Sequence, residues 1–171
     1  MSRVFEYPVI VTIADTNMEG NVYWTNFCVW FGKARELFLI ELLPQGVSPL
    51  EFLMNQRLSI ITCDVAMRFI KSAFFADRLV VKINTANFKG CSVDIISRIM
   101  KISNGSDGSE ELIATGRQKL AFCSSETKRF IPITEELKRV ALQYKEDEEG
   151  EPETPTSVIL DTMHTREMVR A

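Results

Sequence analysis

The alternation of hydrophobic and polar positions divides the chain into a strand, a long helix and four further strands. Residues 6–14 (EYPVIVTIA) predict a strand. Pro8 near its start favours an edge position, because proline cannot donate to a sheet ladder. A polar turn at 15–21 precedes residues 22–42, which carry apolar side chains on nearly every helical face. This pattern is typical of a buried helix.

The next part of the chain shows the period of two that is typical of strands. In TCDVAMRFI, for example, apolar side chains alternate with Asp64, Ala66 and Arg68. The strands predicted in this way are residues 62–70, 78–87, 91–102 and 111–122, with FKG suited to a hairpin between the second and third. A run of strands after one buried helix indicates an α+β fold, in which an antiparallel sheet wraps around the helix.

The C-terminal part predicts a short helix followed by a tail. Thr134 can cap a helix over 135–145, whose first turn holds two glutamates. Residues 146–157 (EDEEGEPETPTS) are acidic, contain proline and lack aromatic side chains, which is typical of disorder. We therefore expect a single domain over residues 1–145 and an acidic, disordered tail over 146–171.

Composition excludes several functional classes. The net charge of −3 argues against binding to nucleic acid or to an anionic membrane, and no apolar run is long enough to span a membrane. The four cysteines are dispersed, so we expect reduced core residues in a cytoplasmic protein. The one histidine, His164, lies in the tail, which argues against a catalytic triad or a histidine metal site. We expect no metal and no cofactor.

Arg35 interrupts the apolar helix. Its helical neighbours are all apolar: Trp24, Cys28, Phe31, Leu39 and Leu42. A guanidinium in such a stripe costs several kcal/mol unless it is paired. Either Arg35 forms a structural ion pair, with Glu36 or with Asp64, or it lines a cavity and binds a negatively charged ligand group.

The polar turn DTNMEGNV lies where a strand ends and the helix begins. Free N–H groups at a helix start attract developing negative charge, so an oxyanion could be stabilised there. The Asn17 amide can hold a water or a carbonyl, but it cannot act as a base at neutral pH. The alternative is that Asp15 and Asn17 only shape the turn.

Together, the turn and the helix segment KARELFL resemble the hot-dog thioesterases of the 4-hydroxybenzoyl-CoA type, over about residues 5–145. Many members carry a catalytic aspartate where this chain has Asn17. The asparagine, the sequence Gly20-Asn21-Val22-Tyr23 and the Arg35-Glu36 pair resemble the branch that acts in enediyne polyketide biosynthesis.

This resemblance implies a hot-dog fold with a five-stranded antiparallel sheet, one long central helix and a short C-terminal helix. It also implies subunits that join their sheets in a homodimer or homotetramer. The implied activity is hydrolysis of a polyene β-ketoacyl thioester, carried as acyl-phosphopantetheine on the acyl carrier protein of a polyketide synthase. Two alternatives stay open: a general acyl-CoA thioesterase, or a non-catalytic acyl-binding hot-dog protein.

The resemblance assigns the functional roles to Asn17 and Arg35. With no acid at position 17, a carboxylate nucleophile there is excluded, and the backbone N–H of Trp24 is the expected oxyanion donor. Asp15 and Glu19 are candidate remote bases. Expected substrate-binding residues are Gly20, Tyr23, Phe27 and Phe31, with Phe27 at a position that is tyrosine in some members. Trp24 and Arg35 are about 16 Å apart along the helix, so Arg35 does not reach a carbonyl held at its own helix start. Three alternatives stay open: Arg35 meets the β-keto group of the acyl chain, acts from a neighbouring subunit, or stabilises the cavity.

Overall fold

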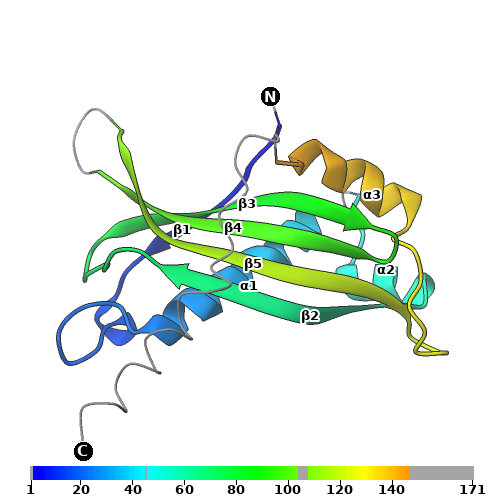
Figure 1. Ribbon diagram of the computed structural model, residues 1–171, viewed down its shortest axis with the longest axis horizontal. Helices are drawn as coiled ribbons and strands as arrows, with labels where there is room; N and C mark the ends of the chain where they lie inside the picture. The colour runs from blue at the N-terminus through cyan, green and yellow to red at the C-terminus, as the bar shows by residue number, and fades with distance from the viewer. Residues whose placement is uncertain (1, 45, 104–107, 147–171) are drawn as a thin grey trace, which may run out of the picture.

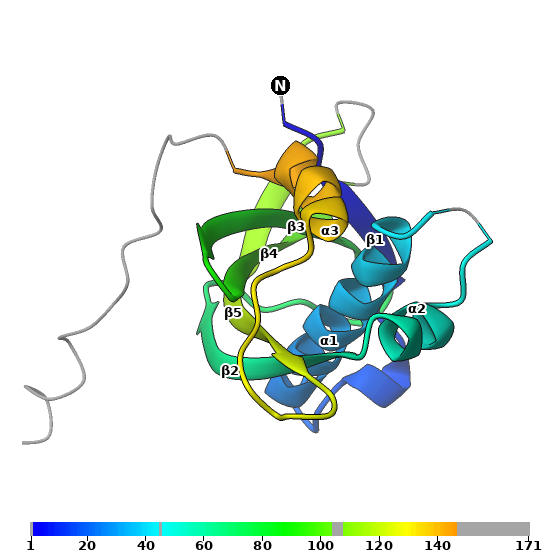
Figure 2. The ribbon, with the colours of Figure 1, turned by 90° about the vertical axis from the view of Figure 1, so that its right-hand side faces the viewer.

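The computed structural model describes residues 2–44, 46–103 and 108–146. In these residues five strands form one antiparallel sheet in the order β1-β3-β4-β5-β2. The strands are β1 (Phe5–Ile10), β2 (Leu58–Phe69), β3 (Arg78–Lys89), β4 (Ser92–Ile102) and β5 (Glu110–Ser124). The helices are α1 (Trp24–Glu41), α2 (Pro49–Asn55) and α3 (Glu135–Ala141), with 3₁₀ turns η1 (Ile13–Asp15) and η2 (Leu142–Tyr144). The sheet curves around α1 (Figures 1 and 2), which confirms the α+β hot-dog arrangement.

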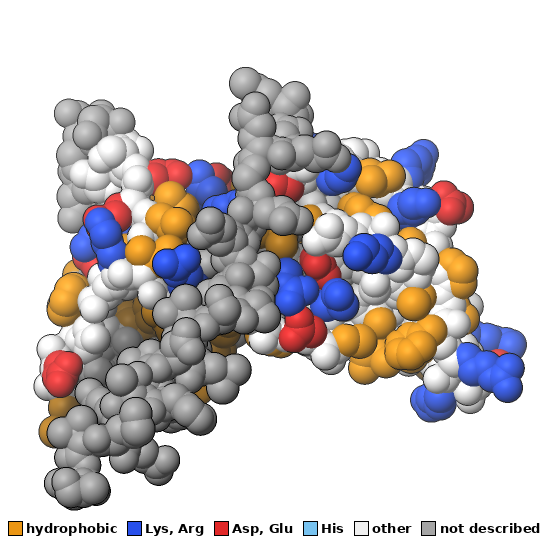
Figure 3. Space-filling model, in the orientation of Figure 1, with side chains coloured by type: hydrophobic (Ala, Val, Ile, Leu, Met, Phe, Trp, Pro, Cys, Tyr) orange, Lys and Arg blue, Asp and Glu red, His pale blue; other side chains and the backbone are white. Residues whose placement is uncertain are grey.

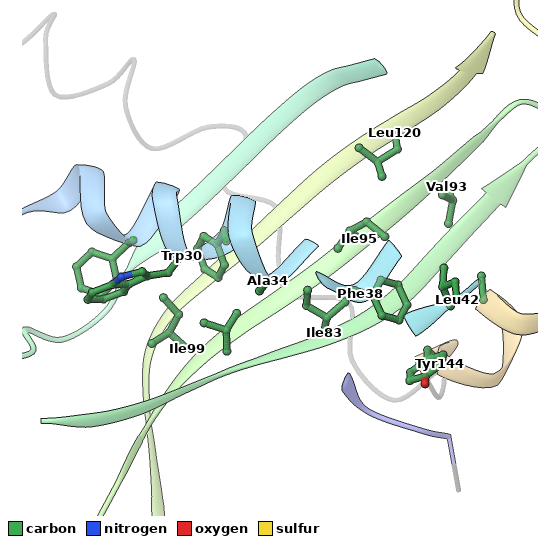
Figure 4. Packing of buried hydrophobic residues seen from close by; sticks show 14 of the residues in the cluster. Trp30, Ala34, Phe38, Leu42, Ile83, Val93, Ile95, Ile99, Leu120 and Tyr144 are labelled. Carbon is green, nitrogen blue, oxygen red and sulfur yellow. The ribbon is translucent and has the colours of Figure 1, made fainter. Parts of the chain in front are cut away.

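The core lies between α1 and the concave face of the sheet. Along α1, Trp30, Ala34 and Phe38 are buried and point toward the strands (Figure 4). The strand residues that meet them include Ile83, Val93, Ile95, Ile99 and Leu120. Tyr144 closes one end of this core, with its ring centroid 5.0 Å from that of Phe38. Each large side chain buried in this way contributes about 1.5–3 kcal/mol, so the core fixes how α1 lies on the sheet.

The first strand is shorter than the pattern predicted. β1 ends at Ile10, and residues 13–15 form the 3₁₀ turn η1 in place of a continued strand. The reason is local: the Asp15 carboxylate accepts hydrogen bonds from the backbone N–H and the hydroxyl of Thr12, at 2.8 and 2.6 Å. These bonds turn the chain before it reaches α1. The edge position that Pro8 predicted is confirmed.

The prediction that α1 is buried on all sides is wrong for the single chain. Val29, Leu37 and Ile40 are exposed, because the sheet covers only the side of the helix that carries Phe31, Ala34 and Phe38. An apolar helix that one sheet covers on one side leaves its other side available for protein contacts.

Sequence patterns missed α2. Ser48 caps this helix by accepting a hydrogen bond from the Glu51 N–H at 3.5 Å, and Pro49 occupies its first position. Both are helix-start signals that the sequence contains. By contrast, the short C-terminal helix is confirmed: the Thr134 side chain accepts a hydrogen bond from Leu137 N–H. The hairpin between β3 and β4 is also confirmed.

β2 forms the second edge of the sheet and begins earlier than predicted. A register shift against β5 between Thr62 and Asp64 leaves Cys63 unpaired and exposed, so the expectation of core cysteines is wrong at this position. It is right for Cys123, which is buried. All four cysteines are free. Ile61 and Val65 are exposed on this strand. Figure 3 shows apolar patches on the surface of the sheet.

The outer face of the sheet carries charged pairs. Arg117 pairs with Asp64 and, at 3.5 Å, with Asp94. Lys82 lies 2.7 Å from Glu110, and the hydrogen bond with this carboxylate raises the pKa of Lys82. Lysine, arginine and acidic side chains accordingly lie side by side over the strands in Figure 3. Asp64 therefore pairs with Arg117 and not with Arg35, the partner that the sequence suggested for it.

The chain reaches this outer face again after α3. Glu146 donates its N–H to the Thr85 carbonyl at 2.8 Å, and its carboxylate pairs with Arg98, whose pKa is lowered by burial. Apart from Glu146, the tail predicted over 146–171 lies outside the described residues. In the described part of the chain, no helix is both long and apolar enough to cross a membrane.

Candidate active site

The polar turn folds as a compact loop between η1 and α1. Thr16 bridges Val22, and the Asn17 N–H donates to the Asn21 carbonyl at 2.8 Å. Gly20 closes the tip with a φ of +82°, a conformation that glycine adopts without steric cost. The Val22 N–H donates to the Ala73 carbonyl at 2.8 Å, which ties the loop to the segment before β3. The backbone of the turn is therefore fixed on both sides.

These constraints orient the side chain of Asn17. Its Oδ1 accepts the Glu19 N–H at 2.9 Å, so the carboxamide oxygen is used within the turn. The Nδ2 group has no acceptor among the described residues. Asn17 thus presents a hydrogen-bond donor, which suits a carbonyl oxygen or an oxyanion better than an attacking water.

The two acids that flank Asn17 differ in their surroundings. The Asp15 carboxylate binds Thr12 through Oδ2 and caps η1, so its structural role is already evident. Glu19 is exposed, and its carboxylate has no partner among the described residues. Of the two candidate remote bases, Glu19 is therefore the one whose carboxylate is free.

The start of α1 offers a backbone donor beside the turn. The Tyr23 N–H donates to the Asp15 carbonyl at 2.9 Å, and the Asn26 N–H donates to the Tyr23 carbonyl at 2.9 Å. The backbone N–H of Trp24, the first residue of α1, has no acceptor in the described part of the chain. Its indole side chain is 54% exposed and lies against Tyr23, with ring centroids 6.1 Å apart. Trp24 N–H is therefore free to bind an anionic oxygen.

Two of the expected substrate-binding residues belong to the core of the single chain. Phe27 is 4% exposed, and its ring centroid lies 5.4 Å from that of Trp30. Phe31 is 1% exposed and packs on Gly116, where an added Cβ would lie 3.0 Å from the ring. Gly20 and Tyr23 lie at the turn itself and are exposed. The structure thus gathers Asn17, Gly20, Tyr23 and Trp24 at the turn and the helix start, but buries the two phenylalanines of α1 in the core.

Arg35 lies at the seam between α1 and the edge strand β2. Its Nη1 donates to the Thr62 hydroxyl at 2.8 Å, and its Nη2 lies 3.8 Å from Glu36 Oε1. The Arg35 side chain is 22% exposed and that of Glu36 is 71% exposed. A pair this long and this exposed contributes little, about 0–1 kcal/mol. The expected pair with Glu36 is therefore present but weak, and it neutralises little of the positive charge of Arg35.

Sequence reasoning missed two polar groups of this region. Asn26, in the first turn of α1, donates from Nδ2 to the Asp15 carbonyl at 2.8 Å. The Oδ1 atom of Asn21 is buried and has no partner among the described residues. A signal for Asn26 was present: the side chain of an asparagine in the first turn of a helix can bond the backbone of the preceding turn.

None of the described residues forms a group of three or more histidine, cysteine or acidic side chains that could hold a metal ion. The chemistry that this arrangement supports is electrostatic. Amide donors from Asn17 and Trp24 lie around one helix start, and a cation lies farther along the same helix. Such donors stabilise negative charge that develops on a carbonyl oxygen.

Comparison with known proteins identifies the family. The model of the thioesterase-like superfamily matches residues 11–140. A search of curated proteins found no match.

Three of the similar solved structures illustrate the fold. The dynemicin thioesterase, studied in crystal structures of polyene binding, is 22% identical with a TM-score of 0.72, covering 85% of this chain and 99% of that one. A hypothetical protein from Staphylococcus aureus in complex with CoA is 15% identical with a TM-score of 0.74, covering 90% and 92%. The 4-hydroxybenzoyl-CoA thioesterase from Pseudomonas sp. strain CBS-3 is 14% identical with a TM-score of 0.69, covering 81% and 99%.

Proposed function

Since the chain belongs to the thioesterase-like superfamily and is a thioester hydrolase, we propose that it releases a polyene β-ketoacyl group from an acyl carrier protein. The carrier would belong to an iterative, enediyne-type polyketide synthase. The observation that carries this proposal is the asparagine at position 17, with its oxygen used inside the turn and its Nδ2 free to donate. The similarity to the dynemicin thioesterase, which binds a polyene in its crystal structures, supports the same substrate class.

In the proposed reaction, the thioester carbonyl oxygen lies between Asn17 Nδ2 and Trp24 N–H. Water or hydroxide adds to the carbonyl carbon, and the resulting oxyanion is held by these two donors. Collapse of the intermediate breaks the C–S bond, the phosphopantetheine thiolate takes up a proton, and a β-keto acid leaves. A β-ketoacyl thioester is an activated electrophile, so positioned donors without an acidic nucleophile are sufficient. Where a base assists, Glu19 has the free carboxylate.

Arg35 completes this site from a second subunit in our proposal. α1 runs antiparallel to β2, since Cys28 Sγ lies 3.4 Å from Met67 Sδ while Arg35 binds Thr62. A two-fold axis through the middle of two antiparallel β2 edges would place the half of one strand that holds Thr62 opposite the half of the other that holds Phe69. Arg35 of one subunit then approaches the helix start of its partner. The exposed apolar side chains along β2 support such a contact.

Mixed dimers test this arrangement. One subunit carries Asn17→Ala and the other Arg35→Ala, and each parent dimer is inactive. If the site is shared, the mixed dimer contains one intact set of Asn17 and Arg35 and recovers hydrolysis. If both residues act within one subunit, every site has lost one of them and no activity returns.

A second candidate is hydrolysis of acyl-CoA thioesters. The S. aureus structure holds CoA, and the Pseudomonas enzyme is named for a CoA substrate. Both candidates require the same donors around the helix start and differ in the carrier that brings the thioester.

The discriminating experiment offers the purified protein the same acyl group on a carrier protein and on CoA. Mass spectrometry then follows release of the free acid, with Asn17→Ala as the inactive control. We expect faster release from the loaded carrier. Faster release from CoA would overturn the carrier assignment while leaving thioester hydrolysis in place.

A further inference from the structure

Asn26 makes a contact that links the candidate site to the body of α1. Its Nδ2 donates to the Asp15 carbonyl at 2.8 Å across eleven residues of sequence, and the side chain is partly buried. The Tyr23 N–H donates to the same carbonyl oxygen at 2.9 Å. One acceptor at the beginning of the turn is therefore held by two donors from the beginning of the helix.

The two donors differ in what they constrain. The Tyr23 N–H belongs to the residue that caps α1, so its bond holds the Asp15 carbonyl against the backbone just before the helix. The second bond comes from a side chain in the first turn of α1, so it ties the same carbonyl to the helix itself. Asp15 leads directly into Thr16 and Asn17, so its carbonyl determines where the rest of the turn begins relative to α1.

We propose that Asn26 is a positioning residue for thioester hydrolysis, an inference that rests on the proposed function. It sets the separation between the Asn17 amide and the Trp24 N–H, the two donors that must meet one oxyanion. Because its own Nδ2 is used on Asp15, Asn26 does not touch the substrate. A misplacement of about 1 Å in such a site costs about 100-fold in rate, so loss of this bond should appear in kcat.

The test replaces Asn26 by leucine, which has the same branching at Cγ and no hydrogen-bond donor in its side chain. The matched control is Thr16→Val, which removes a hydrogen bond of the same length, from the Thr16 hydroxyl to the Ile13 carbonyl, within the same segment. We expect kcat of Asn26→Leu to fall about 10- to 100-fold with KM within about threefold of wild type. The control should keep its kcat. Asn26→Ser, which is smaller and polar, replaces the leucine variant if that protein does not fold.

An unchanged kcat in the folded variant overturns the proposal, and so does an equal loss in Thr16→Val, since the effect would then not be specific to Asp15. Hydrogen exchange supplies a readout that does not depend on activity. In Asn26→Leu the amide protons of Asn17 and Tyr23 should exchange faster than in wild type and in the control. Unchanged exchange also overturns the proposal. A wild-type protein that cleaves no thioester refutes the proposed function, and exchange alone then decides whether Asn26 positions the turn.

Discussion

Replacing Arg35 by alanine separates a structural role of this residue from a functional one. The variant loses the hydrogen bond to Thr62, which is about 0.5–1.5 kcal/mol, and the exposed pair with Glu36, which is about 0–1 kcal/mol. The expected loss in the free energy of unfolding is therefore about 1–2 kcal/mol. Breaking a buried ion pair would cost about 3–5 kcal/mol.

Two measurements on the same preparation test this reasoning. For a protein of this size, a loss of 1 kcal/mol lowers Tm by about 2–4 °C, so the expected fall in Tm is below about 8 °C. Thioester hydrolysis should fall about 10²–10³-fold, as expected when a group that stabilises developing charge is removed. Thr62→Val is the control, because it removes the same hydrogen bond and leaves the guanidinium in place.

Either of two outcomes would refute the functional role. A variant that unfolds, or whose Tm falls as far as a lost buried pair requires, would assign Arg35 to the fold. A stable variant with unchanged hydrolysis would remove it from the site. If Thr62→Val loses as much activity as Arg35→Ala, the hydrogen bond and not the charge is what hydrolysis requires.

Three further changes have defined outcomes. Asn17→Ala should abolish turnover and leave the circular dichroism spectrum and the Tm nearly unchanged; retained turnover, with activity lost instead in Asp15→Ala, would contradict the assignment. Gly116→Ala should destabilise by about 1–3 kcal/mol in urea unfolding, because the new Cβ would lie 3.0 Å from the Phe31 ring. Deleting residues 148–171 should change neither Tm nor hydrolysis, since their composition does not support a packed core, and a large fall in Tm would show otherwise.

Periodicity in the sequence was sufficient for the order of elements and the class of fold. The apolar helix before four alternating strands predicted a sheet wrapped around α1, and the structure has that sheet. Local signals also placed the cap at Thr134 and the edge position of Pro8. They worked because alternation, capping and proline placement depend on neighbours within a few residues along the chain.

The same reasoning failed where distant segments decide the outcome. It buried α1 on every side because periodicity does not show how many layers cover a helix. It also placed Cys63 in the core, although a register shift against β5 leaves this residue at an open edge. The extension of the first strand through η1 was a local error, since the Asp15 carboxylate bonds Thr12 only three residues away.

The candidate site divides in the same way. The sequence by itself identified Asn17 and Arg35 as unusual, one in a helix-entry turn and the other on an apolar stripe. Only the tertiary structure decided that the Asn17 oxygen is used by the Glu19 N–H, that Arg35 faces Thr62, and that Asn26 holds the Asp15 carbonyl. Residue types set which groups can donate or accept a proton. Which of these groups stay free is decided by the partners that folding brings within about 3 Å. For Arg35 and Asn26 these partners come from another strand and from the preceding turn, and for Asn17 the partner comes from within its own turn.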